Sequence, residues 1–190
     1  MKKIGIIGED PNDTSSIQNL LVKKYPKLFN YKPMLKNKKG YQLDNERVPK
    51  SLKVEFDDYN PDIVIFVRDV DGLATEHAKI KKVKDWFTKL NTIVDNKGIL
   101  LHNIYELEAM ILADIDTFNS MYNTQIKFPG NVMYQKEPKE FLIRKTEKLR
   151  KTYAESHCPT IFDQLNFDTV IKNCEYFRTF NEIFVEALND

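Results

Sequence analysis

The chain has few glycines, only two cysteines and no long hydrophobic run. Its six glycines, at positions 5, 8, 40, 72, 98 and 130, form neither a GxxxxGK(S/T) nor a GxGxxG motif, which excludes an ATP-binding P-loop and a dinucleotide-binding fingerprint. A GxSxG nucleophile elbow is also absent. Nucleotide-driven enzymes, nicotinamide-dependent enzymes and serine hydrolases of the α/β type are therefore poorly supported.

The two cysteines, Cys158 and Cys174, lie far apart and form no CxxC pair. This spacing argues against a disulfide framework and a zinc site, and favours two ordinary buried thiols in a reducing compartment. No apolar run approaches the roughly 18–20 residues that span a membrane. The short apolar run after Met1-Lys2-Lys3 is not a signal-peptide core, so we expect a cytoplasmic protein.

An excess of charge of one sign is missing as well, because 29 basic and 28 acidic residues give a net charge of +1. The near-neutral total hides alternating blocks: residues 1–54 carry +7, 55–78 −6, 79–100 +4, 101–126 −4, 127–151 +5 and 152–190 −5. Together with 42% hydrophobic residues over 190 positions, the composition predicts one soluble globular domain. Neutrality by cancellation does not exclude a nucleic-acid partner.

Short apolar runs alternate with longer amphipathic stretches, which predicts an α/β fold. We expect a mostly parallel four-stranded sheet flanked by helices, with strands at 3–8, 31–35, 62–67 and 99–102. Helices are expected from about 15, at 51–56, 75–90, 105–114, 138–153 and 167–188 with a break near 173, and residues 119–137 look irregular. The chain would form a core of about residues 1–118 and a helical C-terminal extension of about 119–190, in which Tyr176, Phe177, Phe180 and Phe184 pack as core.

Acidic residues follow three of the predicted strands. Glu9 and Asp10 follow the first strand, Asp69 and Asp71 follow the third, and the fourth leads through His102 to Glu106 and Glu108. Because functional groups in a parallel sheet gather beyond the carboxyl ends of the strands, these side chains are candidates for one site. Oxygen-only ligands favour Mg²⁺ or Mn²⁺ and phosphoryl chemistry. Helix capping is the alternative for any single residue, with Asp13 or Thr14 as candidate caps of the first helix.

Five short motifs resemble a bacterial Toprim-like family that is known mainly as a domain of unknown function. They are Gly8-Glu9-Asp10, Arg68-Asp69-Val70-Asp71, Glu106-Leu107-Glu108-Ala109 through Ala113-Asp114, Pro138-Lys139-Glu140, and Phe177-Arg178-Thr179-Phe180. Related Toprim domains occur in topoisomerases, primases and the nucleases of the overcoming-lysogenization-defect family. The resemblance spans nearly the whole chain and implies a Toprim-like, Rossmann-like fold.

The resemblance also implies a metal-dependent nuclease. Glu9 would be a general acid/base or a metal ligand, and Asp69 and Asp71 would be catalytic residues that bind Mg²⁺ or Mn²⁺. Glu106 and Glu108 would complete the metal site, with only one of them facing it if both are helical. Leu73 stands where some Toprim proteins carry a third acid, and no catalytic tyrosine is assigned, so hydrolysis is favoured over strand passage.

Nucleic acid, most simply DNA, would need basic surface beside the acidic centre. Two lysine-rich stretches, 23–39 and 136–151, could supply it, although either could also be a solvated face. The candidate nucleic-acid contacts are Lys36, Lys38, Lys39, Arg68, Lys139, Arg144 and Arg178.

Two other functions stay open. The acidic turn after the first strand and the 61–66 strand resemble a response-regulator receiver with a phosphoacceptor Asp, but the expected hydroxyl after 99–103 is missing. Alternatively, the chain is a non-catalytic subunit of a separate ATPase. The related nucleases are often paired with ATPases, so the resemblance suggests such a partner in a bacterial antiphage defence system.

Overall fold

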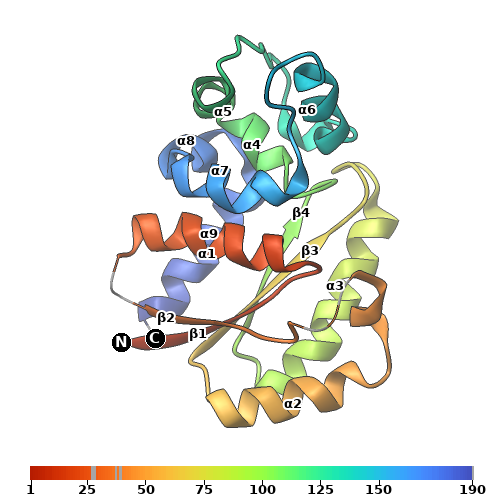
Figure 1. Ribbon diagram of the computed structural model, residues 1–190. Coiled ribbons are helices and arrows are strands. Elements are labelled where there is room, and N and C mark those ends of the chain that lie inside the picture. The colour runs from red at the N-terminus through yellow and green to blue at the C-terminus, as the bar shows by residue number, and fades with distance from the viewer. Residues whose placement is uncertain (27–28, 37, 39, 190) are drawn as a thin grey trace.

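A computed structural model describes residues 1–26, 29–36, 38 and 40–189 (Figure 1). Its centre is a four-stranded, all-parallel sheet in the order β2-β1-β3-β4. The strands are β1 (Lys2–Ile7), β2 (Phe29–Pro33), β3 (Ile63–Asp69) and β4 (Gly98–Asn103). The predicted α/β fold and four-stranded sheet are confirmed.

Alternating side chains of the central strands enter two hydrophobic clusters, one on each face of the sheet. Ile63, Ile65 and Val67 of β3 lie in one cluster, whereas Val64 and Phe66 lie in the other. A strand buried on both faces reads as a continuous apolar run, which is why the sequence signal of β3 is the strongest in the chain.

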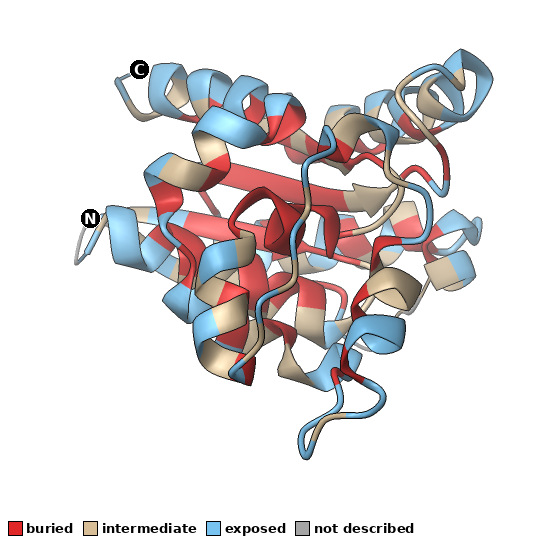
Figure 2. Ribbon diagram, turned by 90° about the horizontal axis from the view of Figure 1, so that it is seen from above, coloured by how far each residue is buried: buried red, intermediate tan, exposed pale blue. Residues whose placement is uncertain are grey.

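Helices cover both faces of the sheet (Figure 1). One cluster includes side chains of α2 (Val48–Tyr59) and α3 (His77–Asn91), and the other joins α1 (Pro11–Lys24) to the C-terminal helices. The latter are α4 (Ala109–Ala113), α5 (Ile115–Tyr122), α6 (Pro138–Thr146), α7 (Cys158–Gln164), α8 (Phe167–Asn173) and α9 (Glu175–Asn189). Figure 2 shows the strands buried between helices whose outer surfaces are exposed.

The C-terminal helices share a hydrophobic cluster with the sheet. Tyr176, Phe177, Phe180 and Phe184 are buried, as the 3–4 residue spacing predicts, and this cluster extends from Ile4 in β1 to Phe184 in α9. Cys158 and Cys174 are buried free thiols, also as expected. The helical region after residue 118 therefore contributes to the main core.

The first helix begins earlier than its sequence suggests. It starts at Pro11, and Asp10, rather than Asp13 or Thr14, is its N-cap; the Asp10 side chain accepts a hydrogen bond from the Asn12 backbone N–H at 2.8 Å. Asp13 completes a capping box by accepting from the Asp10 N–H at 3.0 Å. This arrangement places two carboxylates of the 9–13 turn beside the end of β1.

The helix expected at 105–114 is largely absent, since only 109–113 is helical. Tyr105 has a φ of 62°, and its backbone is paired with the 71–72 turn: the Asp71 N–H donates to Tyr105 O at 3.1 Å, and the Tyr105 N–H donates to Gly72 O at 2.9 Å. These tertiary hydrogen bonds hold residues 103–105 alongside the turn after β3 and prevent helix formation there.

Other boundaries after residue 115 also differ from expectation. The segment predicted as irregular contains the second half of α5, and α7 lies in a segment for which no helix is predicted. The helix that starts at Pro138 ends at Thr146 and does not continue to Tyr153. At this end the Thr146 Oγ1 accepts a hydrogen bond from the Tyr153 N–H at 2.8 Å.

Among the described residues, no helix is long and apolar enough to cross a membrane.

Candidate active site

Acidic side chains gather at the carboxyl ends of β1, β3 and β4. β1 and β3 are neighbours, as the prediction of one shared site requires, and the Asp69 N–H donates to Glu9 Oε1 at 3.2 Å. A cavity of about 330 Å³ opens here. It is lined by Glu9, Asp10, Asp13, Gly40, Asp69, Asp71, Glu106, Leu107, Glu108, Lys139, Glu155 and Cys158. All five acidic residues that the sequence singled out as metal ligands therefore line one space, which we call the carboxylate cavity.

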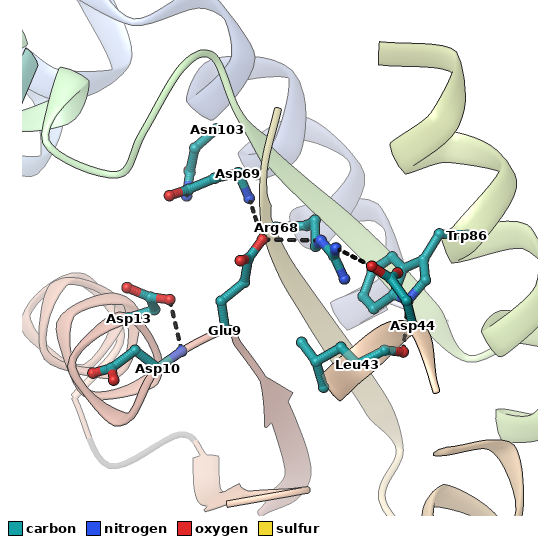
Figure 3. A network of polar contacts seen from close by, with 9 residues as sticks. All are labelled: Glu9, Asp10, Asp13, Leu43, Asp44, Arg68, Asp69, Trp86 and Asn103. Atoms are coloured by element: carbon teal, nitrogen blue, oxygen red, sulfur yellow. Dashed lines mark hydrogen bonds and ion pairs between the residues drawn. The ribbon is translucent and has the colours of Figure 1, made fainter. Parts of the chain in front are cut away.

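Glu9 is oriented by Arg68, the last-but-one residue of β3 (Figure 3). The Arg68 Nε lies 2.9 Å from Glu9 Oε1, and its Nη2 lies 3.0 Å from Asp44 Oδ2. The guanidinium carbon also lies over the Trp86 ring, 4.8 Å from its centroid. Burial raises the pKa of Glu9 above its ordinary value, and the Arg68 charge opposes that rise.

Asp69 and Asp13 are the carboxyl groups on the β1–β3 side whose pKa values are raised furthest. Burial and the nearby Asp13 charge raise the pKa of Asp69 well above its usual range, although the Asn103 Nδ2 donates to its Oδ1 at 2.8 Å (Figure 3). Burial raises the pKa of Asp13 to about 7, with the Glu9 charge acting in the same direction. These carboxylates resist ionisation unless a cation compensates their charge.

Glu106 and Glu108 both line the cavity. The expectation that only one would face it applied to a helix, and neither residue lies within one. Both precede α4 in the non-helical segment that Tyr105 begins. Burial raises the pKa of Glu106, while the Lys139 N–H donates to its Oε2 at 3.2 Å. Burial raises the pKa of Glu108 to about 7, and the Tyr153 hydroxyl donates to its Oε1 at 2.9 Å.

The turn after β3 places the second aspartate. Asp71 has a φ of 52°, and the Lys79 Nζ donates to its backbone oxygen at 2.6 Å. The turn is therefore anchored to α3 on one side and to the 103–105 segment on the other, which leaves Asp71 at the cavity wall.

Three of the eight lining acids are not among the predicted metal ligands. Asp10 is predicted to lie at the site but not to bind metal, and Asp13 is predicted as a helix cap or as part of a receiver-like acidic turn. Glu155 and the supporting Tyr153 come from the C-terminal region. Asp10 and Asp13 lie in the same short acidic turn as Glu9, which is a usable sequence signal. No sequence signal marks Glu155, because only the packing of the C-terminal region brings it to the edge of the sheet.

The predicted basic residues separate into two groups. Arg68 and Lys139 lie in the site; the Lys139 Nζ is 3.7 Å from Glu106 Oε1. Lys36 and Lys38 line a smaller cavity beside the start of α1, and Lys39 lies outside the described residues. The exposed Arg144 and Arg178 do not line the carboxylate cavity.

His102 is not part of the site. It lies on β4 and lines an apolar groove with Phe180 and Ile183, and burial lowers its pKa. The sequence placed it at a strand end correctly, but its side chain belongs to the other side of that strand.

The lining side chains fit a hard divalent cation by donor type. Eight carboxylates and one lysine line the cavity, and oxygen donors of this kind suit Mg²⁺ or Mn²⁺. Within the part of the chain that the structure describes, however, no three His, Cys, Asp or Glu side chains converge tightly enough to hold a metal ion. Glu9 instead binds Arg68 and the Asp69 N–H. The donors are therefore gathered around one cavity but not arranged as a coordination shell.

No family model, curated protein or solved structure matches this chain.

Proposed function

We propose that the protein hydrolyses phosphodiester bonds of nucleic acid with the help of Mg²⁺ or Mn²⁺, as a Toprim-type nuclease. The observation that carries the proposal is the carboxylate cavity at the carboxyl edge of a parallel sheet, lined by eight acids and one lysine. Burying carboxylates together is unfavourable without a compensating cation. A divalent ion would offset this cost and would also attract a phosphate substrate to the cavity.

Asp69, Asp71 and Glu108 are the residues that would hold the ion, with Glu106 beside them. When bound, such an ion stabilises the charge that develops on a phosphoryl oxygen. The chain itself contributes Glu9, whose Oε1 is occupied by Arg68 and by the Asp69 N–H. No hydrogen bond joins its Oε2 to another described residue, and this is the atom that would exchange a proton with the attacking water or the leaving oxygen. A raised pKa brings this carboxyl closer to the working range of a general acid/base near neutral pH.

The proposal also includes a relationship to Toprim-like proteins and a biological role. The parallel 2-1-3-4 sheet order and the acids after β1 and β3 support a Toprim-like relationship. A separate ATPase partner and a role in bacterial antiphage defence follow from the sequence resemblance alone.

Nicking of supercoiled plasmid tests the proposal. We expect wild-type protein to nick DNA with Mg²⁺ or Mn²⁺ and to lose activity in EDTA. Glu9→Gln and Asp69→Asn should each lower the rate by about 100-fold or more, since they remove a proton-transfer group and a proposed ion ligand. The exposed Glu182→Gln on α9 is the matched control and should retain wild-type activity.

Equal nicking by wild type, Glu9→Gln and Asp69→Asn would overturn the catalytic assignment. Thermal denaturation of each variant separates loss of chemistry from loss of the fold. Phosphorylation of an aspartate by acetyl phosphate, without nicking, would favour the receiver-like alternative.

A further inference from the structure

A second cleft adjoins the carboxylate cavity on the other side of the turn after β3. It has a volume of about 240 Å³ and is lined by Asp44, Arg68, Asp69, Val70, Asp71, Lys79, Lys82, Val83 and Trp86. Asp69 and Asp71 line both spaces, so the 69–71 turn forms a common wall. A ligand that fills one space therefore lies next to a ligand in the other.

The cleft differs from the cavity in charge. Three cations, Arg68, Lys79 and Lys82, and three carboxylates line it, whereas the cavity has a single lysine against eight carboxylates. Lys79 is paired with Glu76 at 2.9 Å, outside the lining. Lys79, Lys82 and Trp86 are three and four residues apart on α3 and so lie on one face of that helix. The positive block at 79–100 supplies these side chains.

Lys82 and Arg68 have unused capacity to bind an anion. The Lys82 side chain is exposed, and none of the described residues forms an ion pair with it. Arg68 engages Glu9 and Asp44 through Nε and Nη2, but its buried Nη1 has no acceptor within the described chain. A buried donor without an acceptor is costly, and a small movement of the Arg68 side chain toward a ligand oxygen would remove that cost.

We propose that this cleft, through Lys82 above all, binds a phosphate of the substrate strand, the one next to the phosphate held at the carboxylate cavity. The inference rests on the proposed nuclease function and adds a subsite to it. Adjacent phosphates of one strand would lie on either side of the 69–71 turn, with Lys82 and Lys79 at one of them. Arg68 would then link the two positions, since it contacts Glu9 of the cavity and lines the cleft.

Trp86 offers a direct readout, because it is the only tryptophan of the chain and it lines the cleft. We would titrate the full chain with short oligothymidylate and with short oligouridylate, in Ca²⁺, and follow tryptophan fluorescence. We expect a saturable change, and the relative affinities distinguish DNA from RNA as the source of the phosphate.

Lys82→Ala tests the contact itself. Loss of one phosphate contact should weaken binding by about 3- to 10-fold at low salt and reduce the slope of log K against log salt by roughly 0.7. In nicking assays, KM should rise while kcat stays near wild type. The control is Lys84→Ala, an exposed lysine of the same helix that lines the apolar groove instead.

An unchanged Trp86 signal, or equal affinities for Lys82→Ala and Lys84→Ala, would overturn the subsite even if plasmid nicking is observed. Conversely, a saturable Trp86 response that is weakened by Lys82→Ala, in a protein that does not nick DNA, would support the subsite and reject the hydrolytic function. The two proposals can therefore fail separately.

Discussion

Buried carboxylates set the behaviour of the site at the scale of single residues. Burial raises the pKa of Glu9, Asp13, Asp69, Glu106 and Glu108. Each is easier to keep neutral in the folded chain than in the unfolded one. Their ionisation therefore opposes folding unless a cation binds between them.

The difference between the folded and unfolded pKa values of these carboxyl groups predicts how the stability of the protein depends on pH. A carboxyl whose pKa is raised on folding stabilises the protein fully at low pH, and that contribution is lost as pH rises through the folded pKa. For Glu108 the pKa rises from its ordinary value of 4.5 to about 7 on folding, so its contribution to stability is lost over this pH range. We expect the melting temperature in EDTA to fall between about pH 5 and pH 8, and Mg²⁺ to reduce the fall because a bound cation favours the ionised carboxylates.

Differential scanning fluorimetry in EDTA and in Mg²⁺ measures both effects. A melting temperature in EDTA that stays constant or rises over this range would contradict the account of the buried acids.

Tyr153 is the residue that supports Glu108, because its hydroxyl donates to the Glu108 carboxylate at 2.9 Å in a buried position. Tyr153→Phe removes this donor and should lower the free energy of unfolding by about 1–3 kcal/mol, the cost of leaving a buried acceptor unsatisfied. Urea denaturation measures the change. Tyr134→Phe, at a tyrosine that is 60% exposed, should have almost no effect, and equal losses in both variants would argue against the contact.

At the scale of elements, the strands follow the sequence closely, while several helices do not. β3 and β4 are predictable to within about two residues at each end because each contains a short apolar run. Residues 105–108 have a helical pattern, yet the backbone groups of Asn103 and Tyr105 pair with the 70–72 turn. Such pairing between distant segments overrides local helix preference and cannot be read from a local pattern.

The loop after α5 offers a test of a single element. The Asn119 side chain donates from Nδ2 to Ile126 O and accepts at Oδ1 from the Ile126 N–H, both at 2.9 Å. Asn119→Ala leaves these backbone groups without partners and should cost about 2 kcal/mol of unfolding free energy. Ser120→Ala, its exposed neighbour, should cost less than about 0.5 kcal/mol. Chemical denaturation compares the two, and similar values would show that Asn119 does not hold the loop.

At the scale of the whole molecule, the alternating charge blocks meet in space. The block at 55–78 supplies Asp69 and Asp71, and the block at 101–126 supplies Glu106 and Glu108 to the same cavity. The positive block at 79–100 supplies the adjoining cleft. A net charge of +1 thus conceals an acidic space beside a more basic one.

The acidic site residues at the edge of the sheet could be predicted from the sequence, because they directly follow buried strands. Residues that reach the site from outside the sheet could not. Glu155 and Tyr153 arrive through the packing of the C-terminal helices against α1 and α5, and Asp44 arrives through its pairing with Arg68. No local pattern marks such residues, since their role depends on contacts between distant parts of the chain.

Binding of Mn²⁺, followed by isothermal titration calorimetry near neutral pH, tests the central claim most directly. We predict saturable binding to the wild-type protein. Binding should weaken by at least about 10- to 100-fold in Asp69→Asn, because loss of a proposed ligand should cost at least as much as loss of a supporting residue. Glu182→Gln should bind as the wild type does. Absence of binding to the wild type, or equal affinities in Asp69→Asn and Glu182→Gln, would contradict a metal centre in the carboxylate cavity.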